Sequence, residues 1–158
     1  MERLDLENDH KLIVFTEWVR EFCIRHNVPE LPYNEEKVND ILNREYSETE
    51  GLTSEECFSS AMILMNYAGY LQREIDYLKS FKNRCSHVLS FGYASRWNQF
   101  DQYMPAEVKK QAIVNESEYL PKVQENELRL SSGIQMLEKQ CEDIRNRANL
   151  YKEMGKKR

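Results

Sequence analysis

The stretch TSEECFSSAMILMNYAGYLQREIDYLKSFKNRCSHVLSF, residues 53–91, decides the fold of this chain. Thr53 and Glu56 have the spacing of a capping box, so a long helix is expected to begin here. Apolar or small residues then recur every three or four positions, a heptad pattern typical of a helix that lies along a partner helix. They are Ala61, Leu64, Ala68, Leu71, Ile75, Leu78, Cys85 and Leu89, and Lys82 interrupts the series. Gly92 is expected to end the helix.

A second heptad pattern runs from residue 121 to about residue 154. Pro121 suits the first position of a helix, and Gly155 suits the residue just after its end. The stripe consists of Val123, Leu130, Ile134, Leu137, Cys141, Ile144, Ala148 and Tyr151, with Glu127 out of character. The two patterns predict an antiparallel hairpin of helices over 54–90 and 121–154. Because a two-helix hairpin has a thin core, we expect other helices or other copies of the chain to cover it.

The residues before the hairpin predict two shorter helices. Asp9 can cap a helix over 9–27 that ends before Pro29, and Asn34 can cap a second helix to about Tyr46. The polar run SETEG, residues 47–51, predicts a turn, and Pro105 is expected to open a helix to about residue 115. The sequence therefore predicts an all-α protein that forms oligomers. It has an acidic N-terminal helical region over 1–52 and a hairpin body over 53–158.

Charge divides the chain in a similar way. Residues 1–60 carry 15 acids and 6 bases, whereas residues 61–158 carry 12 acids and 16 bases. The expected body is thus the more basic part, although the formal net charge of the chain is −5. An acidic front can contact basic surfaces of partner proteins or shield a nucleic-acid site.

Composition and motifs argue against several functional classes. No apolar run reaches the roughly 18 residues of a membrane helix, and the first residues do not resemble a secretory signal. The four cysteines are scattered without a C-x-x-C pair, so we expect small core residues in a reducing compartment rather than metal ligands. The chain has no glycine-rich phosphate loop, nucleophile elbow or H-E-x-x-H motif. We expect no enzyme, no catalytic residue, no metal and no cofactor.

One stretch, residues 79–103, combines basic side chains with aromatic rings. Single-stranded DNA binding needs cations for the phosphates and flat rings for the unstacked bases. The candidate residues in this stretch are Lys79, Lys82, Arg84, Tyr93, Arg96 and Trp97. Arg145 and Arg147 are weaker candidates, because the dipole of a helix also favours bases near its C-terminus. The alternative interpretation is that the rings close the end of the hairpin and the bases form a solvated face.

The region from Glu55 to the C-terminus resembles the UvsY family of phage recombination mediators in the order and spacing of its parts. These parts are an amphipathic helix (59–78), the K-x-R pair Lys82-Asn83-Arg84, a tyrosine-containing loop (91–103) and a long last helix with the basic turn Ile144-Arg145-Asn146-Arg147. Two features depart from the family: the run CSHVLSF separates the K-x-R pair from the loop, and the acidic front is longer.

The resemblance implies a non-enzymatic accessory of homologous recombination. Such mediators form rings, bind single-stranded DNA and help load a RecA-like recombinase onto strands covered by single-strand-binding protein. It further implies action in the cytoplasm, that of the host if the chain is phage-encoded. The competing interpretation is a structural coiled-coil scaffold, chaperone or adaptor that binds other proteins without nucleic acid. Residues 79–97 divide the two, since only the first function needs this stretch exposed.

Overall fold

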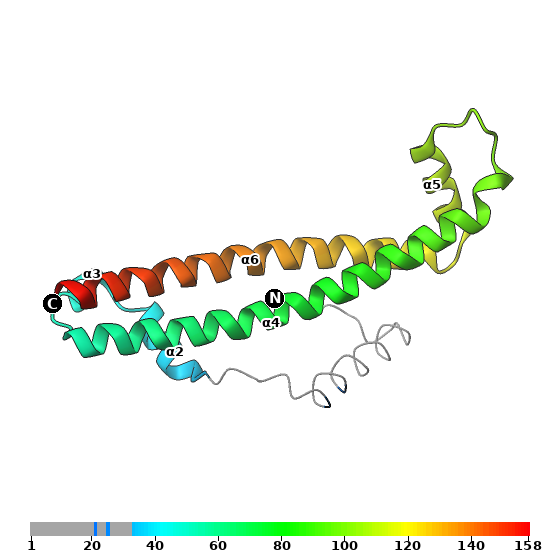
Figure 1. Cartoon of the computed structure of the whole chain (residues 1–158). Helices are drawn as coiled ribbons and strands as arrows, with labels where there is room; N and C mark the ends of the chain where they lie inside the picture. Colours follow the sequence, from blue (N-terminus) through cyan, green and yellow to red (C-terminus); the bar gives the residue numbers. More distant parts are fainter. Residues whose placement is uncertain (1–20, 22–24, 26–32) are drawn as a thin grey trace. The chain divides into compact units, whose positions relative to one another are not determined.

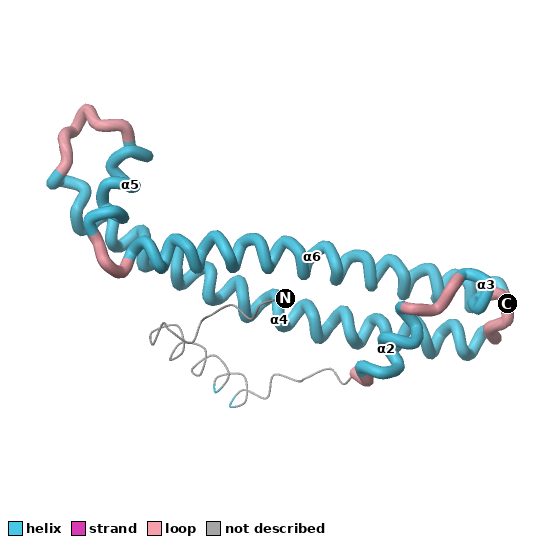
Figure 2. The backbone as a smooth tube through the Cα atoms, turned by 180° about the vertical axis from the view of Figure 1, so that it is seen from behind, coloured by secondary structure: helices cyan, strands magenta, loops and turns pink. Residues whose placement is uncertain are grey.

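The computed structural model describes residues 33–158, together with Glu21 and Arg25 (Figure 1). These residues form helices joined by short loops, with no strand among them (Figure 2). The helices are α2 (Glu35–Leu42), α3 (Tyr46–Thr49), α4 (Ser54–Arg96), the 3₁₀ helix η2 (Trp97–Gln99), α5 (Ala106–Glu116) and α6 (Leu120–Lys157). The expected all-α class is therefore confirmed, with one long helix packed against another. None of the described helices has the length and apolar character needed to cross a membrane.

The short helices before α4 follow the expected pattern in part. The helix expected over 9–27 lies outside the described residues apart from Glu21 and Arg25. Asn34 caps α2 as predicted, because its Oδ1 accepts the Lys37 backbone N–H at 3.1 Å. The expected helix to about Tyr46 is divided, however, into α2 and the short α3, which occupies part of the predicted turn.

The start of α4 confirms the predicted capping box. The Glu56 N–H donates to Thr53 Oγ1 at 3.2 Å, and the Thr53 N–H donates to Glu56 Oε2 at 2.7 Å. Hydrogen bonds to the Glu56 carboxylate from the backbone N–H of Thr53 and from its side chain hold the pKa of Glu56 below its ordinary value. The capping box thus satisfies two backbone N–H groups where the helix begins.

The predicted end of the first long helix is wrong, because α4 continues through Gly92 to Arg96. A Cβ atom on Gly92 would lie 2.8 Å from Leu120 Cδ1. Glycine at this position therefore allows the buried Leu120 to approach the helix, and does not end it. The helix expected after Pro105 is confirmed as α5, and a break at 117–119 precedes α6.

The predicted end of the last helix is also wrong. Gly155 is a buried residue within α6, which continues to Lys157. A Cβ atom on Gly155 would lie 3.2 Å from Cys57 Cβ, and the Ser54 hydroxyl donates to the Gly155 carbonyl at 2.8 Å. Gly155 thus permits close contact between the end of α6 and the start of α4. Helix α6 begins at Leu120, one residue before the expected Pro121.

The described chain forms two compact units, and each contains part of α4 and part of α6. The first unit comprises Glu21, Arg25 and residues 77–134 of the described chain, including α5. In it α4 and α6 run antiparallel, since Gly92 lies against Leu120 and the Ser86 hydroxyl donates to Glu127 Oε2 at 3.1 Å. Its core consists of Phe81, Cys85, Leu89, Ile113, Val114, Leu120, Val123 and Leu130.

The second unit comprises residues 33–76 and 135–158. Its parts of α4 and α6 are also antiparallel, because the Cys141 thiol donates to the Ala68 carbonyl at 3.4 Å, while Gly155 meets Cys57. Tyr33, just before α2, packs on α4 with its ring centroid 4.4 Å from that of Tyr70. The proposed division at residue 52 stays a prediction, although residues 33–52 join parts of both long helices in this unit.

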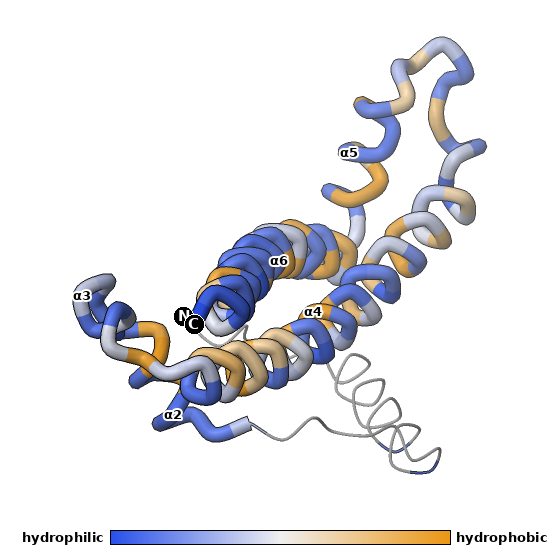
Figure 3. The backbone as a smooth tube through the Cα atoms, turned by 60° about the vertical axis from the view of Figure 1, so that its left-hand side comes forward, coloured by the Kyte–Doolittle hydropathy of each residue, from blue (hydrophilic) through white to orange (hydrophobic). Residues whose placement is uncertain are grey.

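Most residues of the two heptad stripes are buried, but at two positions a neighbouring residue is buried in place of the expected one. Hydrophobic residues recur along both long helices between hydrophilic ones (Figure 3), and most expected stripe residues are buried. Phe81 is buried where the pattern had Lys82, which is half-buried. Asn126 is buried beside the half-buried Glu127. Leu78 and Leu137 are half-buried rather than buried.

Candidate functional site

The predicted nucleic-acid residues fall into both units. Six of them lie in the first unit: Lys79, Lys82, Arg84, Tyr93, Arg96 and Trp97. Arg145 and Arg147 lie in the second unit.

In the first unit, two predicted rings carry lysines from a different helix. The Lys109 ammonium lies 5.0 Å from the centre of the Trp97 ring, and the Lys110 ammonium lies 5.9 Å from the centre of the Tyr93 ring. Both lysines come from α5, whereas Tyr93 lies in the last turn of α4 and Trp97 opens η2. These distances fall within the range of cation–π attraction.

Tyr93 and Trp97 are half-buried and pack against the core of the first unit. Burial raises the pKa of the Tyr93 hydroxyl, although the nearby Lys110 opposes this shift. Lys109 is only 5% exposed, so its stem forms part of the same packing. The arrangement supports the interpretation in which these two rings close the end of the helices.

Other rings of the first unit are open to solvent. Phe91 is 72% exposed and Tyr103 is 84% exposed. Among the predicted bases, Lys79 is exposed, while Lys82, Arg84 and Arg96 are half-buried. Phe91 and Tyr103 lie in the aromatic stretch of the sequence, which by itself does not separate exposed rings from packed ones. Two exposed rings thus occur together with one exposed and three half-buried bases within residues 79–103.

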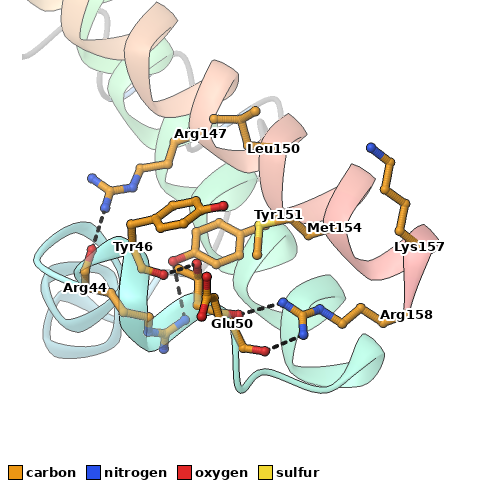
Figure 4. A pocket seen from close by; sticks show the side chains of 10 residues that line it. Arg44, Tyr46, Glu50, Arg147, Leu150, Tyr151, Met154, Lys157 and Arg158 are labelled. Carbon is orange, nitrogen blue, oxygen red and sulfur yellow. Dashed lines mark hydrogen bonds between the residues drawn. The ribbon is translucent and has the colours of Figure 1, made fainter.

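In the second unit, Arg145 and Arg147 have different partners. Arg145 is exposed and donates to Gln72 Oε1 at 3.1 Å. Arg147 donates to the backbone carbonyl of Arg44 at 3.1 Å and borders a cavity of about 650 Å³. The cavity lies between α6 and the segment around α3, and Figure 4 shows its lining.

The floor of this cavity is apolar and aromatic, and cations surround it. Leu150, Tyr151 and Met154 of α6 line it together with Tyr46 and Thr49 of α3. Four cationic side chains also line it: Arg44, Arg147, Lys157 and Arg158. Glu50 is the one carboxylate among the lining residues of this described unit. The sequence pattern indicates Arg147 but gives no sign that it shares a cavity with Tyr46.

The arginines of the cavity are held by neutral oxygens. The Arg158 guanidinium donates to the carbonyls of Thr49 and Glu50. The Arg44 guanidinium donates to the Ser60 hydroxyl at 3.2 Å and lies 5.8 Å from the centre of the Tyr151 ring. Within the described chain no carboxylate forms a salt bridge with these arginines. Their charge therefore remains available to an anion at the cavity.

The described residues contain no cluster of three or more potential metal ligands. Cys57, Cys85 and Cys141 are buried thiols outside any disulfide bond. Comparisons with protein-family models, with curated proteins and with solved structures found no match to this chain. The resemblance to recombination mediators therefore depends on the order and spacing of the sequence elements alone.

Proposed function

We propose that the chain is a non-enzymatic recombination mediator that binds single-stranded DNA and helps load a RecA-like recombinase. The observation that carries this proposal is the combination of exposed rings and bases in residues 79–103. Phe91 and Tyr103 offer ring faces to unstacked bases, while Lys82, Arg84 and Arg96 offer charge to phosphates. The resemblance adds single-strand-binding protein as a partner and the cytoplasm as the location, that of the host if the chain is phage-encoded.

Self-association into a homo-oligomer, with a ring as the form implied by the resemblance, belongs to the same proposal. Phe58, Met62 and Met65 of α4 are exposed at intervals of four and three residues, so they form an apolar stripe on one face. Such a stripe is typical of a helix that packs against another chain. A ring-shaped oligomer would present the modest basic patch of each copy many times along one DNA strand.

The second candidate is a scaffold or adaptor without nucleic acid. The packing of Trp97 and Tyr93 against the core favours it, because these rings then have a structural role. The two candidates differ in what residues 79–103 do, so substitutions there divide them.

The test is oligonucleotide binding by fluorescence anisotropy across a salt series. For single strands, log K falls by about 0.7 for each phosphate contact per unit of log salt. The double variant Lys82→Glu/Arg84→Glu should weaken binding and flatten this slope. Lys139→Glu/Lys152→Glu is the matched control, because it reverses two exposed lysines of α6 in the second unit.

Ring stacking is tested at the exposed positions. Phe91→Ser or Tyr103→Ser should each cost about 1–3 kcal/mol of binding if the ring stacks on a base, with little change in the salt slope. Circular dichroism and sedimentation would verify that fold and mass are retained. If the Lys82→Glu/Arg84→Glu variant keeps its fold and mass and binds oligonucleotide as tightly as its control, the DNA proposal fails. The scaffold interpretation is then preferred.

A further inference from the structure

The cavity of the second unit has the features of a protein-recognition pocket. Its volume of about 650 Å³ lies within the usual range of roughly 300–1,000 Å³ for binding pockets. Tyrosine, arginine and methionine, the residue types enriched in the centres of protein interfaces, supply most of its lining. At its edge, Tyr46 is 81% exposed and Leu150 is also exposed, so apolar surface continues beyond the cavity.

The charge around the cavity selects for an anionic ligand. Arg147 and Arg158 are fixed by hydrogen bonds to backbone carbonyls, and each guanidinium has further N–H groups to donate. Because the arginines are already positioned, an incoming carboxylate would order few additional side chains. Lys157, exposed at the edge of the cavity, adds a flexible cation.

The surroundings favour a short acidic peptide over a nucleic-acid strand. Glu45, Glu48 and Glu50 are all exposed on or beside α3, next to the cavity. A phosphate backbone carries a negative charge on every nucleotide, so it would bring more charges near these carboxylates than a peptide with one or two acids, and like charges repel. A peptide can instead place one apolar side chain in the cavity and one or two carboxylates against the cations.

We propose that this cavity, bordered by Tyr46, Arg147, Tyr151, Lys157 and Arg158, binds an acidic peptide segment of a partner protein. A large apolar side chain of the peptide contacts Tyr151 and Met154. A flanking carboxylate pairs with Arg147, Lys157 or Arg158. The site is independent of residues 79–103, so it stands whether or not that stretch binds DNA.

The first experiment selects peptides on the full-length chain from a random dodecapeptide display library. Peptides that combine Asp or Glu with a large apolar residue should be enriched. The enrichment should be lost with the variant Tyr46→Ala/Lys157→Gln, which changes two exposed side chains. Lys152→Gln is the matched control, since Lys152 is an exposed lysine of the same helix outside the cavity lining. No acidic–apolar enrichment, or equal enrichment on the variant, would overturn the proposal.

The second experiment measures the dissociation constant of the enriched peptide by fluorescence anisotropy. Tyr46→Ala or Lys157→Gln should each raise it about tenfold if the peptide contacts these side chains, and Lys152→Gln should leave it unchanged. Replacing the acids of the peptide by Asn and Gln should also raise it about tenfold. Equal binding of the neutral peptide would refute the ionic part of the proposal.

Other occupants give different results with the same proteins. If an oligonucleotide displaces the peptide and its own affinity falls in Lys157→Gln, the cavity is a nucleic-acid site and the peptide proposal is wrong. If sedimentation shows that Tyr46→Ala/Lys157→Gln changes the mass of the free chain, the occupant is a second copy. Loss of DNA binding in Lys82→Glu/Arg84→Glu, with peptide binding intact, would separate this site from the proposed DNA function.

Discussion

Replacing the buried Asn126 by leucine is expected to stabilise the chain. Asn126 is 7% exposed, and its amide Nδ2 is buried without an acceptor in the described chain. A buried polar group without a partner costs about 1–3 kcal/mol. Leucine has the same branched shape with two methyl groups in place of the amide atoms. The Asn126→Leu replacement therefore removes the cost of the buried amide. Position 126 lies on the helix face that also carries the buried Val123 and Leu130.

The neighbouring residue provides a matched control. Glu127 is half-buried and accepts a hydrogen bond from the Ser86 hydroxyl at 3.1 Å. Glu127→Leu removes this bond and should cost about 1 kcal/mol. The same replacement at two successive positions of α6 is therefore expected to have opposite effects on the free energy of unfolding.

Thermal unfolding followed by circular dichroism measures both effects. For a chain of this size, 1 kcal/mol changes the Tm by about 2–4 °C, so Asn126→Leu should raise it by about 2–12 °C. Glu127→Leu should lower it by a few degrees. If instead Asn126→Leu lowers the Tm and Glu127→Leu raises it, Glu127 occupies the contact position that the heptad pattern gives it. The described packing of α6 would then be wrong.

Three further predictions concern helix packing, capping and tyrosine ionisation. Gly133→Ala should stabilise α6 by about 1 kcal/mol, because a Cβ atom there meets nothing within 4 Å. Gly155→Val should destabilise α6 by about 1–3 kcal/mol, because its side chain would press against α4. Equal midpoints of urea unfolding for the two variants would contradict this prediction. Thr53→Ala removes a helix cap and should lower the unfolding free energy by about 1 kcal/mol in urea titration, so an unchanged midpoint would argue against the cap. A hydrogen bond with Tyr33 raises the pKa of Tyr70 from 10.0 to about 12, so the neutral phenol stabilises the fold fully below pH 10 and loses this effect as the pH rises through about 12. Phenolate absorbance should therefore rise at lower pH in Tyr33→Phe, and an unchanged titration would exclude the hydrogen bond.

The parts of the fold that could be predicted have local causes. The capping box at Thr53 and the cap at Asn34 each depend on residues three positions apart, which the sequence displays directly. The long helices follow from apolar spacing that their own residues determine. Such features need no knowledge of what the helix packs against.

The two wrong helix ends have the opposite cause. Gly92 and Gly155 were expected to end helices, because glycine commonly follows the last turn. Both instead lie within helices at points of close contact, with Leu120 and with Cys57 respectively. Each contact joins residues far apart in the chain, so a local pattern cannot distinguish a glycine that ends a helix from one that admits a neighbour.

The candidate sites show the same limit at the level of side-chain pairs. The sequence places Trp97 next to Arg96, yet the cation above its ring is Lys109 of α5. It follows that a base can stack on that face of Trp97 only after Lys109 has moved, which costs the cation–π contact and rearranges a buried lysine. Phe91 and Tyr103 are exposed and carry no such cost. If the first unit binds single-stranded DNA, these two rings should therefore contribute more to affinity than the tryptophan that the sequence pattern singled out.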